Sequence, residues 1–281
     1  MIIRTLAASA ALALAIPAHA VVGVTLQRDS FGLDSFEYVQ DFDTLAATSG
    51  TATVAWANDT TIDGWSLFDA NKVGKTTYRA SHGSDSSGTF YSYGANGVGE
   101  RALGAVGAGT TYWGSPASSG LSGYIALALR NDAGVALEGV GVYWDAEQWR
   151  LGQDNQTTDA VDFRYGFGDT FATVTTWINP GASFKYNSPI LNTAGGAGAA
   201  LDGNANAIAL GGDIALDWQA GQTLWLTWID YNSAGNDHGV AIDNVFVTAA
   251  LAPVPEPSTI ALMVAGLGLV GLGATRRQRR S

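Results

Sequence analysis

The chain has 281 residues, a formal net charge of −11, 36 glycines, 9 tryptophans and no cysteine. The acidic balance argues against nucleic acid as a partner, and the absence of cysteine excludes disulfides, thiol nucleophiles and cysteine-ligated metal sites. The length leaves room for one sizeable β-domain between two terminal segments.

Residues 1–20 have the three parts of a secretory signal peptide. Arg4 is a short positive n-region, residues 6–16 are an apolar stretch, and Ala18-His19-Ala20 is a small-x-small cleavage site that follows Pro17. We expect cleavage after Ala20, so that the rest of the chain is exported. An uncleaved N-terminal anchor is the alternative.

Residues 21–252 read as a single all-β body, because Gly, Thr, Val and aromatic residues are frequent and no long segment has helical periodicity. Short runs separated by Gly, Asn, Asp and Ser predict about eleven strands, and this spacing is typical of a two-sheet jelly-roll-like sandwich. The expected strands are Phe36–Phe42, Thr51–Trp56, Thr76–Ala80, Thr89–Tyr93, Gly123–Arg130, Val135–Trp144, Ala160–Phe167, Ala172–Ile178, Ala207–Leu210, Thr223–Asp230 and Val240–Thr248.

Residues 253–281 form a distinct tail with three parts in order: a proline-rich motif at 254–258, an apolar segment at 259–275 and an arginine cluster at 276–280. As a helix, Ile260–Ala274 would be roughly 22 Å long, against a bilayer core of roughly 30 Å. The segment therefore predicts a short transmembrane helix, and the arginines place its C-terminal end on the cytoplasmic side. A plain single-span anchor is the alternative interpretation.

The order of these three parts resembles the PEP-CTERM sorting signal of Gram-negative bacteria, which an exosortase recognises. The resemblance implies that Pro255, Glu256 and Pro257 are the sorting motif, and that exosortase and, at least transiently, the membrane are partners. The tail family is also labelled an ice-binding protein C-terminal domain. The body has no regular Thr-x-Thr ladder, so we do not infer ice binding.

The body contains short sequence motifs, for example at residues 99–104, 146–150 and 224–228. These motifs resemble those of a group of uncharacterised exported β-sandwich domains found with PEP-CTERM tails. The closing run Ala241-Ile242-Asp243-Asn244-Val245 resembles the last strand of MAM-like and carbohydrate-binding jelly rolls. In the sugar-binding relatives an aspartate of that strand can hold structural calcium, and Asp243 occupies the similar place.

Calcium takes carboxylate, amide and carbonyl oxygens, and these are the ligands that this chain offers. Asp230, Asp237 and Asp243 all belong to the last predicted hairpin, and Asp41 and Asp43 follow the first strand. Since first and last strands often lie side by side in jelly rolls, we predict a structural calcium on Asp243 with help from Asp41 or Asp43. In the alternative, Asp243 caps a turn.

Asp145 and Glu147 lie two residues apart, so a continuing strand would put both carboxylates on one face, as sugar hydrolysis requires. The jelly-roll glycosidases have a third acid in the place of Tyr143, and Glu147 could instead pair with Arg150 or Arg101. We therefore expect no enzyme. His82 and His238 are expected to be solvated loop residues.

Two functions follow from the sequence. The first is a non-enzymatic exported protein, sorted by an exosortase to the cell envelope, the surface or the extracellular polysaccharide matrix. The alternative is a carbohydrate-binding or carbohydrate-active module, for which Trp113, in a loop-like context, is the candidate glycan contact.

Overall fold

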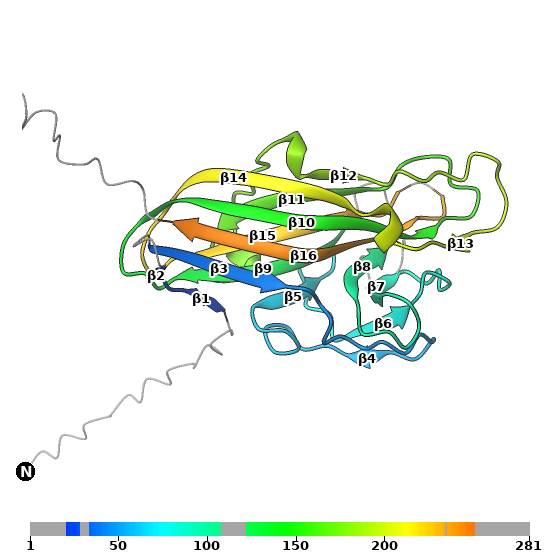
Figure 1. Cartoon of the computed structure of the whole chain (residues 1–281), viewed down its shortest axis with the longest axis horizontal. Coiled ribbons are helices and arrows are strands. Elements are labelled where there is room, and N and C mark those ends of the chain that lie inside the picture. The colour runs from blue at the N-terminus through cyan, green and yellow to red at the C-terminus, as the bar shows by residue number, and fades with distance from the viewer. Residues whose placement is uncertain (1–20, 29–33, 108–121, 234, 251–281) are drawn as a thin grey trace, which may run out of the picture.

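The computed structural model describes residues 21–28, 34–107, 122–233 and 235–250. Within these residues the chain is nearly all β, and two sheets pack face to face around one large hydrophobic core (Figure 1). The all-β, two-sheet sandwich that the sequence predicts is confirmed.

Eight strands make the jelly roll: β3 (Asp34–Gln40), β9 (Ser122–Asn131), β10 (Leu137–Leu151), β11 (Ala160–Phe167), β12 (Lys185–Asn187), β14 (Ile208–Trp218), β15 (Thr223–Tyr231) and β16 (Gly239–Ala250). The order β3-β16-β10-β14 runs through the larger sheet, and the order β9-β15-β11-β12 runs through the smaller sheet. If these eight strands are numbered in chain order, the larger sheet has the order 1-8-3-6. The smaller sheet has the order 2-7-4-5. Because the chain crosses between the sheets in this way, the first and last strands lie side by side.

Between β3 and β9 the chain adds β4 (Val54–Ala55), β5 (Trp65–Phe68), β6 (Thr77–Ser81), β7 (Thr89–Tyr93) and β8 (Ala102–Val106). Strand β5 joins the smaller sheet beside β9, and the other four extend the larger sheet from the edge of β16. Short β1 (Val22–Val24), β2 (Gln27–Arg28) and β13 (Ala199–Ala200) complete the sheets. Three 3₁₀ turns, η1 (Phe171–Thr173), η2 (Ala182–Phe184) and η3 (Asn204–Asn206), lie in the connections.

Aromatic side chains from both sheets fill the space between them. Trp228 of β15 stacks on Trp65 with ring centroids 5.4 Å apart and meets the ring of Trp144, from the opposite sheet, nearly at right angles at 5.7 Å. Phe163 of β11 lies 5.2 Å from the Trp144 ring. All four side chains are at most 2% exposed, so this aromatic cluster joins the two sheets.

Two strands were predicted to the residue, and others were not. β7 and β11 have the expected bounds. The predicted strand Ala172–Ile178 is wrong: Thr170 caps the turn η1 through a reciprocal capping box, and only Ile178 forms a bridge, with Tyr165. β5 and β8 were missed; almost all of their residues are buried, so neither shows the alternation that marks a half-buried strand.

None of the helical segments among the described residues is long and apolar enough to cross a bilayer. The predicted signal peptide (1–20), the sorting motif Pro255-Glu256-Pro257, the apolar segment 259–275 and Trp113 all lie outside the described residues.

The aromatic cluster gives a direct test of the packing. We expect Trp228→Ala to lower the free energy of unfolding by about 3–5 kcal/mol, because it removes a buried indole from the contact between the sheets. Chemical denaturation of the full-length protein measures this change. Trp177→Ala is the matched control, because Trp177 is only half-buried, and a loss for Trp228→Ala no larger than that of the control would contradict this account.

Candidate functional site

The closing strand β16 changes partner halfway along one edge. One edge of β16 pairs with β10 along most of its length. On the opposite edge, residues 239–242 pair with β8 and residues 245–250 pair with β3. Asp243 and Asn244 lie at the change, where the register with β10 also shifts and Asn244 has a φ of 47°. The bulge leaves the carboxylate of Asp243 in the gap between the end of β3 and the start of β8.

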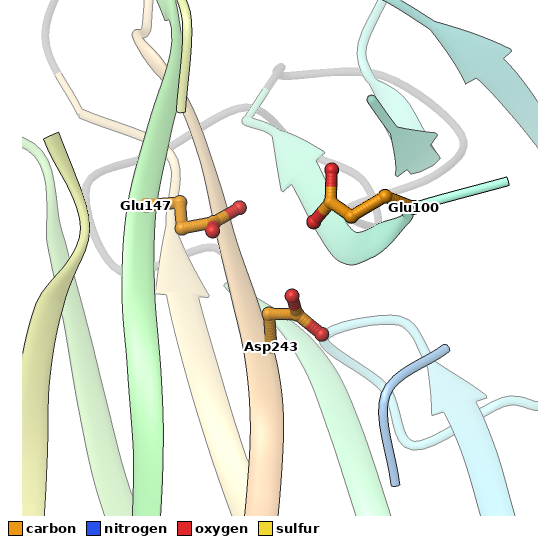
Figure 2. A group of neighbouring side chains, drawn as sticks. All are labelled: Glu100, Glu147 and Asp243. Atoms are coloured by element: carbon orange, nitrogen blue, oxygen red, sulfur yellow. The ribbon is translucent and has the colours of Figure 1, made fainter. Parts of the chain in front are cut away.

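Three carboxylates meet at this gap (Figure 2). Glu100 precedes β8, Glu147 lies on β10 and Asp243 lies on β16, and one carboxylate oxygen from each lies within 4.8 Å of the other two. Glu147 is 2% exposed and Asp243 is 3% exposed, whereas Glu100 is half-buried at the rim. We call these three residues the carboxylate cluster.

Neutral donors, not arginines, bind the cluster. The Trp149 indole donates to Glu147 Oε2 at 2.6 Å, and the Asn204 amide donates to Glu100 Oε2 at 2.6 Å. The expected ion pair of Glu147 is wrong for the described residues, because both candidate arginines bind elsewhere. Arg101 donates to Ser92 and the Ala95 carbonyl, and Arg150 donates to the carbonyls of Gly83 and Ser84.

Burial and repulsion from neighbouring acids favour the protonated forms of Glu147 and Asp243. Burial raises the pKa of Glu147 to about 7, with Glu100 and other nearby acids adding to it and the Trp149 hydrogen bond opposing it. Burial also raises the pKa of Asp243 to about 8; the Asn244 backbone N–H opposes this, and the charges of Glu147 and Glu100 add to it. A hard cation that replaced these protons would find oxygen ligands already gathered.

The same burial argues against sugar hydrolysis at this position. Asp145 and Glu147 do share the outward face of β10, as expected, since Val142 and Trp144 point into the core. However, Asp145 accepts a hydrogen bond from the Asn244 amide at 3.0 Å, and Glu147 is almost wholly covered. A polymeric substrate cannot reach between the two carboxylates.

The structure places the predicted calcium ligands as follows. Asp243 is in the carboxylate cluster, and β3 lies beside β16 as expected. Asp43 is exposed and its Oδ1 accepts the Arg101 backbone N–H at 2.9 Å, while Asp41 Oδ1 accepts the Asp43 N–H at 3.2 Å. Neither belongs to the cluster, and sequence reasoning missed Glu100, which no spacing connects to Asp243.

Asp230 and Asp237 gather away from Asp243, around Asp159 and His238. The expectation that His238 is solvated is wrong: it is 1% exposed, its Nδ1 accepts the Gly152 N–H at 2.8 Å, and its Nε2 lies 3.1 Å from the Thr157 carbonyl. These contacts require a neutral ring protonated at Nε2, and burial lowers the pKa of His238 accordingly. His82 is exposed, as expected.

Two buried carboxylate oxygens in this second group, Asp159 Oδ1 and Asp230 Oδ2, have no hydrogen-bond partner. Burial, with the charge of Asp159, raises the pKa of Asp237 to about 8. Asp237 also lines a pocket of about 420 Å³ beside Arg150 and Gln153.

This second group predicts a pH effect that Asp237→Asn isolates. Below about pH 4 the aspartate is protonated in the folded and the unfolded chain alike. As pH rises from there to about 8, only the unfolded chain releases the proton. The free energy of unfolding of the wild type should therefore fall relative to the variant by up to about 1.4 kcal/mol per pH unit.

Chemical denaturation of both full-length proteins between pH 4 and pH 8 measures this difference, which includes the influence of the Asp237 charge on the pKa of Asp230. Exposed Asp217→Asn, on β14, should show no such trend. A difference that stays constant across this pH range would contradict the assignment.

On the larger sheet's outward face, Tyr143 is 39% exposed and donates its hydroxyl to Asp213 Oδ1 at 2.9 Å. The aromatic ring of Phe246, on β16, lies beside it with centroids 6.4 Å apart. Exposed Tyr143 and half-buried Phe246 thus form an aromatic surface among the described residues, to which Trp113 does not belong.

Two comparisons bear on the body, one with curated proteins and one with solved structures. A search of curated proteins found no match. Among solved structures, the CBM22-1 xylan-binding domain of Paenibacillus barcinonensis Xyn10C is 10% identical over 74% of this chain and 100% of that domain, with a TM-score of 0.34. The mannan-recognising carbohydrate-binding module TmCBM27 is 14% identical over 76% of this chain and 98% of that module, with a TM-score of 0.33.

The K3 cleaved adhesin domain of Lys-gingipain from Porphyromonas gingivalis is 10% identical over 66% of this chain and 91% of that domain, with a TM-score of 0.33. Likenesses at these scores carry no argument about ligand or activity. The tail gives a definite result, since the family model described as the PEP-CTERM protein-sorting motif matches residues 253–280. The chain therefore carries the signal of an exported protein that the exosortase pathway sorts to the envelope or surface.

Proposed function

We propose that this chain is a non-enzymatic exported protein that an exosortase sorts to the cell envelope, the cell surface or the extracellular polysaccharide matrix. The observation that carries the proposal is the sorting motif at residues 253–280, placed directly after an all-β body whose last described residue is Ala250. The burial of Glu147 and Asp243 supports a body without hydrolase activity.

The topology of the proposal follows from the two ends of the sequence. The signal peptide at 1–20 sends the body out of the cytoplasm, and the apolar segment 259–275 stops in the membrane with the arginines of 276–280 inside. Pro255 and Pro257 disfavour helix, which leaves Glu256 in an extended segment that an enzyme can recognise.

The carboxylate cluster is the proposed structural calcium site. Glu100, Glu147 and Asp243 replace the sequence-based set of Asp243 with Asp41 or Asp43, since among the described residues these three bring one carboxylate oxygen each within 4.8 Å of one another. A cation here would join β8, β10 and β16 at the point where β16 changes partner.

Carbohydrate binding is the second candidate function. It is favoured by one observation, the exposed ring of Tyr143 beside Phe246 on the outward face of the larger sheet. An exposed aromatic ring on the face of a sheet offers an apolar surface against which a sugar ring can stack.

The sorting proposal predicts the fate of a tail variant. Replacing Pro255, Glu256 and Pro257 by alanine should leave the protein in the inner membrane with its tail intact, because the extended recognition segment is lost. Cell fractionation and the mass of the protein measure this outcome. Thr259→Ala, just after the motif, serves as the control, and unchanged tail processing and location in the triple variant would refute the role of the motif.

The cation proposal predicts a calcium-dependent melting temperature. Calcium at 100 times its dissociation constant would stabilise the folded chain by about 2.7 kcal/mol, which for a domain of this size is several degrees. Melts of the full-length protein with calcium and with a chelator measure the difference, and Asp243→Asn and Glu147→Gln should each remove most of it.

Two further variants separate the possible ligand sets. Asp217→Asn removes an exposed carboxylate far from the cluster in sequence and should keep the full calcium response. Asp43→Asn should also keep it if Glu100 is a ligand; loss of the response in Asp43→Asn with retention in Glu100→Gln would restore the sequence-based set. Identical melts with calcium and chelator would end the proposal.

A further inference from the structure

We propose that the outward face of the larger sheet, centred on Tyr143, is a binding surface for a neutral polysaccharide chain. The inference rests on the carbohydrate-binding candidate above and assigns it a place and a ligand class. Tyr143 of β10 pairs with Phe246 of β16 and Gly211 of β14, and Phe246 pairs with Val39 of β3. These four residues occupy one row across β3, β16, β10 and β14, strands that lie side by side in Figure 1.

The ring of Tyr143 reaches along its own strand over Gly141. A Cβ at Gly141 would lie 3.1 Å from Tyr143 Cε2, so the missing side chain makes room for the ring. The hydroxyl then reaches Asp213, the residue that pairs with Gly141 on β14, at 2.9 Å. The tether holds the ring in place before any ligand arrives, which reduces the entropy lost on binding.

A second glycine keeps the next position open. Gly211 has a φ of 127°, and a Cβ there would lie 2.1 Å from the Val142 carbonyl oxygen and 2.7 Å from Tyr143 Cα. No other residue fits, so no side chain stands beside the ring on β14. Glycines on both sides of Tyr143 therefore leave the outer side of the ring clear, in keeping with its 39% exposure.

Phe246 and Val39 extend the apolar surface on the other side of Tyr143. The planes of the Tyr143 and Phe246 rings are inclined by 32°, and Val39 is 64% exposed. The row therefore offers a shallow apolar strip that runs across the strands, suited to the faces of successive sugar rings rather than to one small molecule.

The polar groups around the strip select the ligand class. Glu37, Thr248 and Asp213 lie in the neighbouring row of the sheet, and Asp145 and Asn244 lie on the other side. Strands β3, β14 and β16 contain no lysine or arginine, and Arg150 of β10 is buried and bound to backbone carbonyls. The carboxylates accept hydrogen bonds from sugar hydroxyls and repel uronate or sulfate groups.

The same charges disfavour a second copy of this chain as the occupant. Two copies joined through this face would bring Glu37, Asp145 and Asp213 of each against the other, and strands β3, β14 and β16 supply no lysine or arginine to compensate. A neutral polysaccharide meets the strip without this repulsion.

The test uses the full-length protein in a detergent without a sugar headgroup. Calorimetric titration with cello-, xylo- and manno-oligosaccharides, and with oligogalacturonate as the acidic probe, gives the affinities. We expect at least one neutral oligosaccharide to bind and the acidic one not to bind. Tyr143→Ala and Phe246→Ala should each weaken neutral binding by tenfold or more, and Tyr143→Phe, which keeps the ring but loses the tether, should weaken it less.

Trp177→Ala is the matched control, because it removes a half-buried aromatic residue from outside this face and should not change the affinity. Unchanged melting temperatures of the Tyr143 variants show that binding, not folding, was lost. Binding that survives Tyr143→Ala and Phe246→Ala would overturn the site while leaving carbohydrate binding intact. Tighter binding of oligogalacturonate would overturn the ligand class. Absence of binding to any of the glycans, or self-association that is lost in Tyr143→Ala, would overturn both this inference and the carbohydrate-binding candidate. Neither outcome would affect the sorting proposal.

Discussion

The pairing of the closing strand β16 sets the arrangement on which the rest of the body depends. A buried strand must satisfy its backbone N–H and C=O groups on both edges, and β16 does this with β10 on one edge and with β8 and then β3 on the other. Because β3 closes the jelly roll and β8 belongs to the inserted segment, the junction at Asp243 and Asn244 joins the two parts of the larger sheet. The carboxylate cluster lies at this junction.

Buried acids at such a junction lower the stability of the folded protein when no cation is bound. Buried carboxylates lose hydration and repel one another, and only neutral donors such as the Trp149 indole oppose this at Glu147. The folded chain can keep the group neutral with protons or with a cation. The outside of a cell supplies calcium more abundantly than the cytoplasm does, so a calcium-dependent junction would suit a protein that carries an export signal.

How much of the fold and of the candidate site could be predicted from the sequence depends on how far apart the interacting residues lie along the chain. Alternation within β11 is local, so its bounds, Ala160–Phe167, were predicted correctly. The partner of Asp243 is not local: Glu100 reaches it only because β8 pairs with β16, and no pattern near Glu100 announces that pairing. His238 was misjudged for the same reason, since its partner Gly152 lies 86 residues away.

In strand β10, side chains that alternate between the two faces contribute to the core, to the aromatic strip and to the carboxylate cluster. Its inward residues Val142 and Trp144 build the core, while its outward residues run from Tyr143 through Asp145 to Glu147. The outward series passes from the aromatic strip to the carboxylate cluster within five residues. Asp145 connects the strip to the cluster, because it accepts a hydrogen bond from the side-chain amide of Asn244. Asn244 belongs to the same bulge as Asp243. A cation that fixes the bulge would therefore also fix the carboxylate at the edge of the proposed glycan surface.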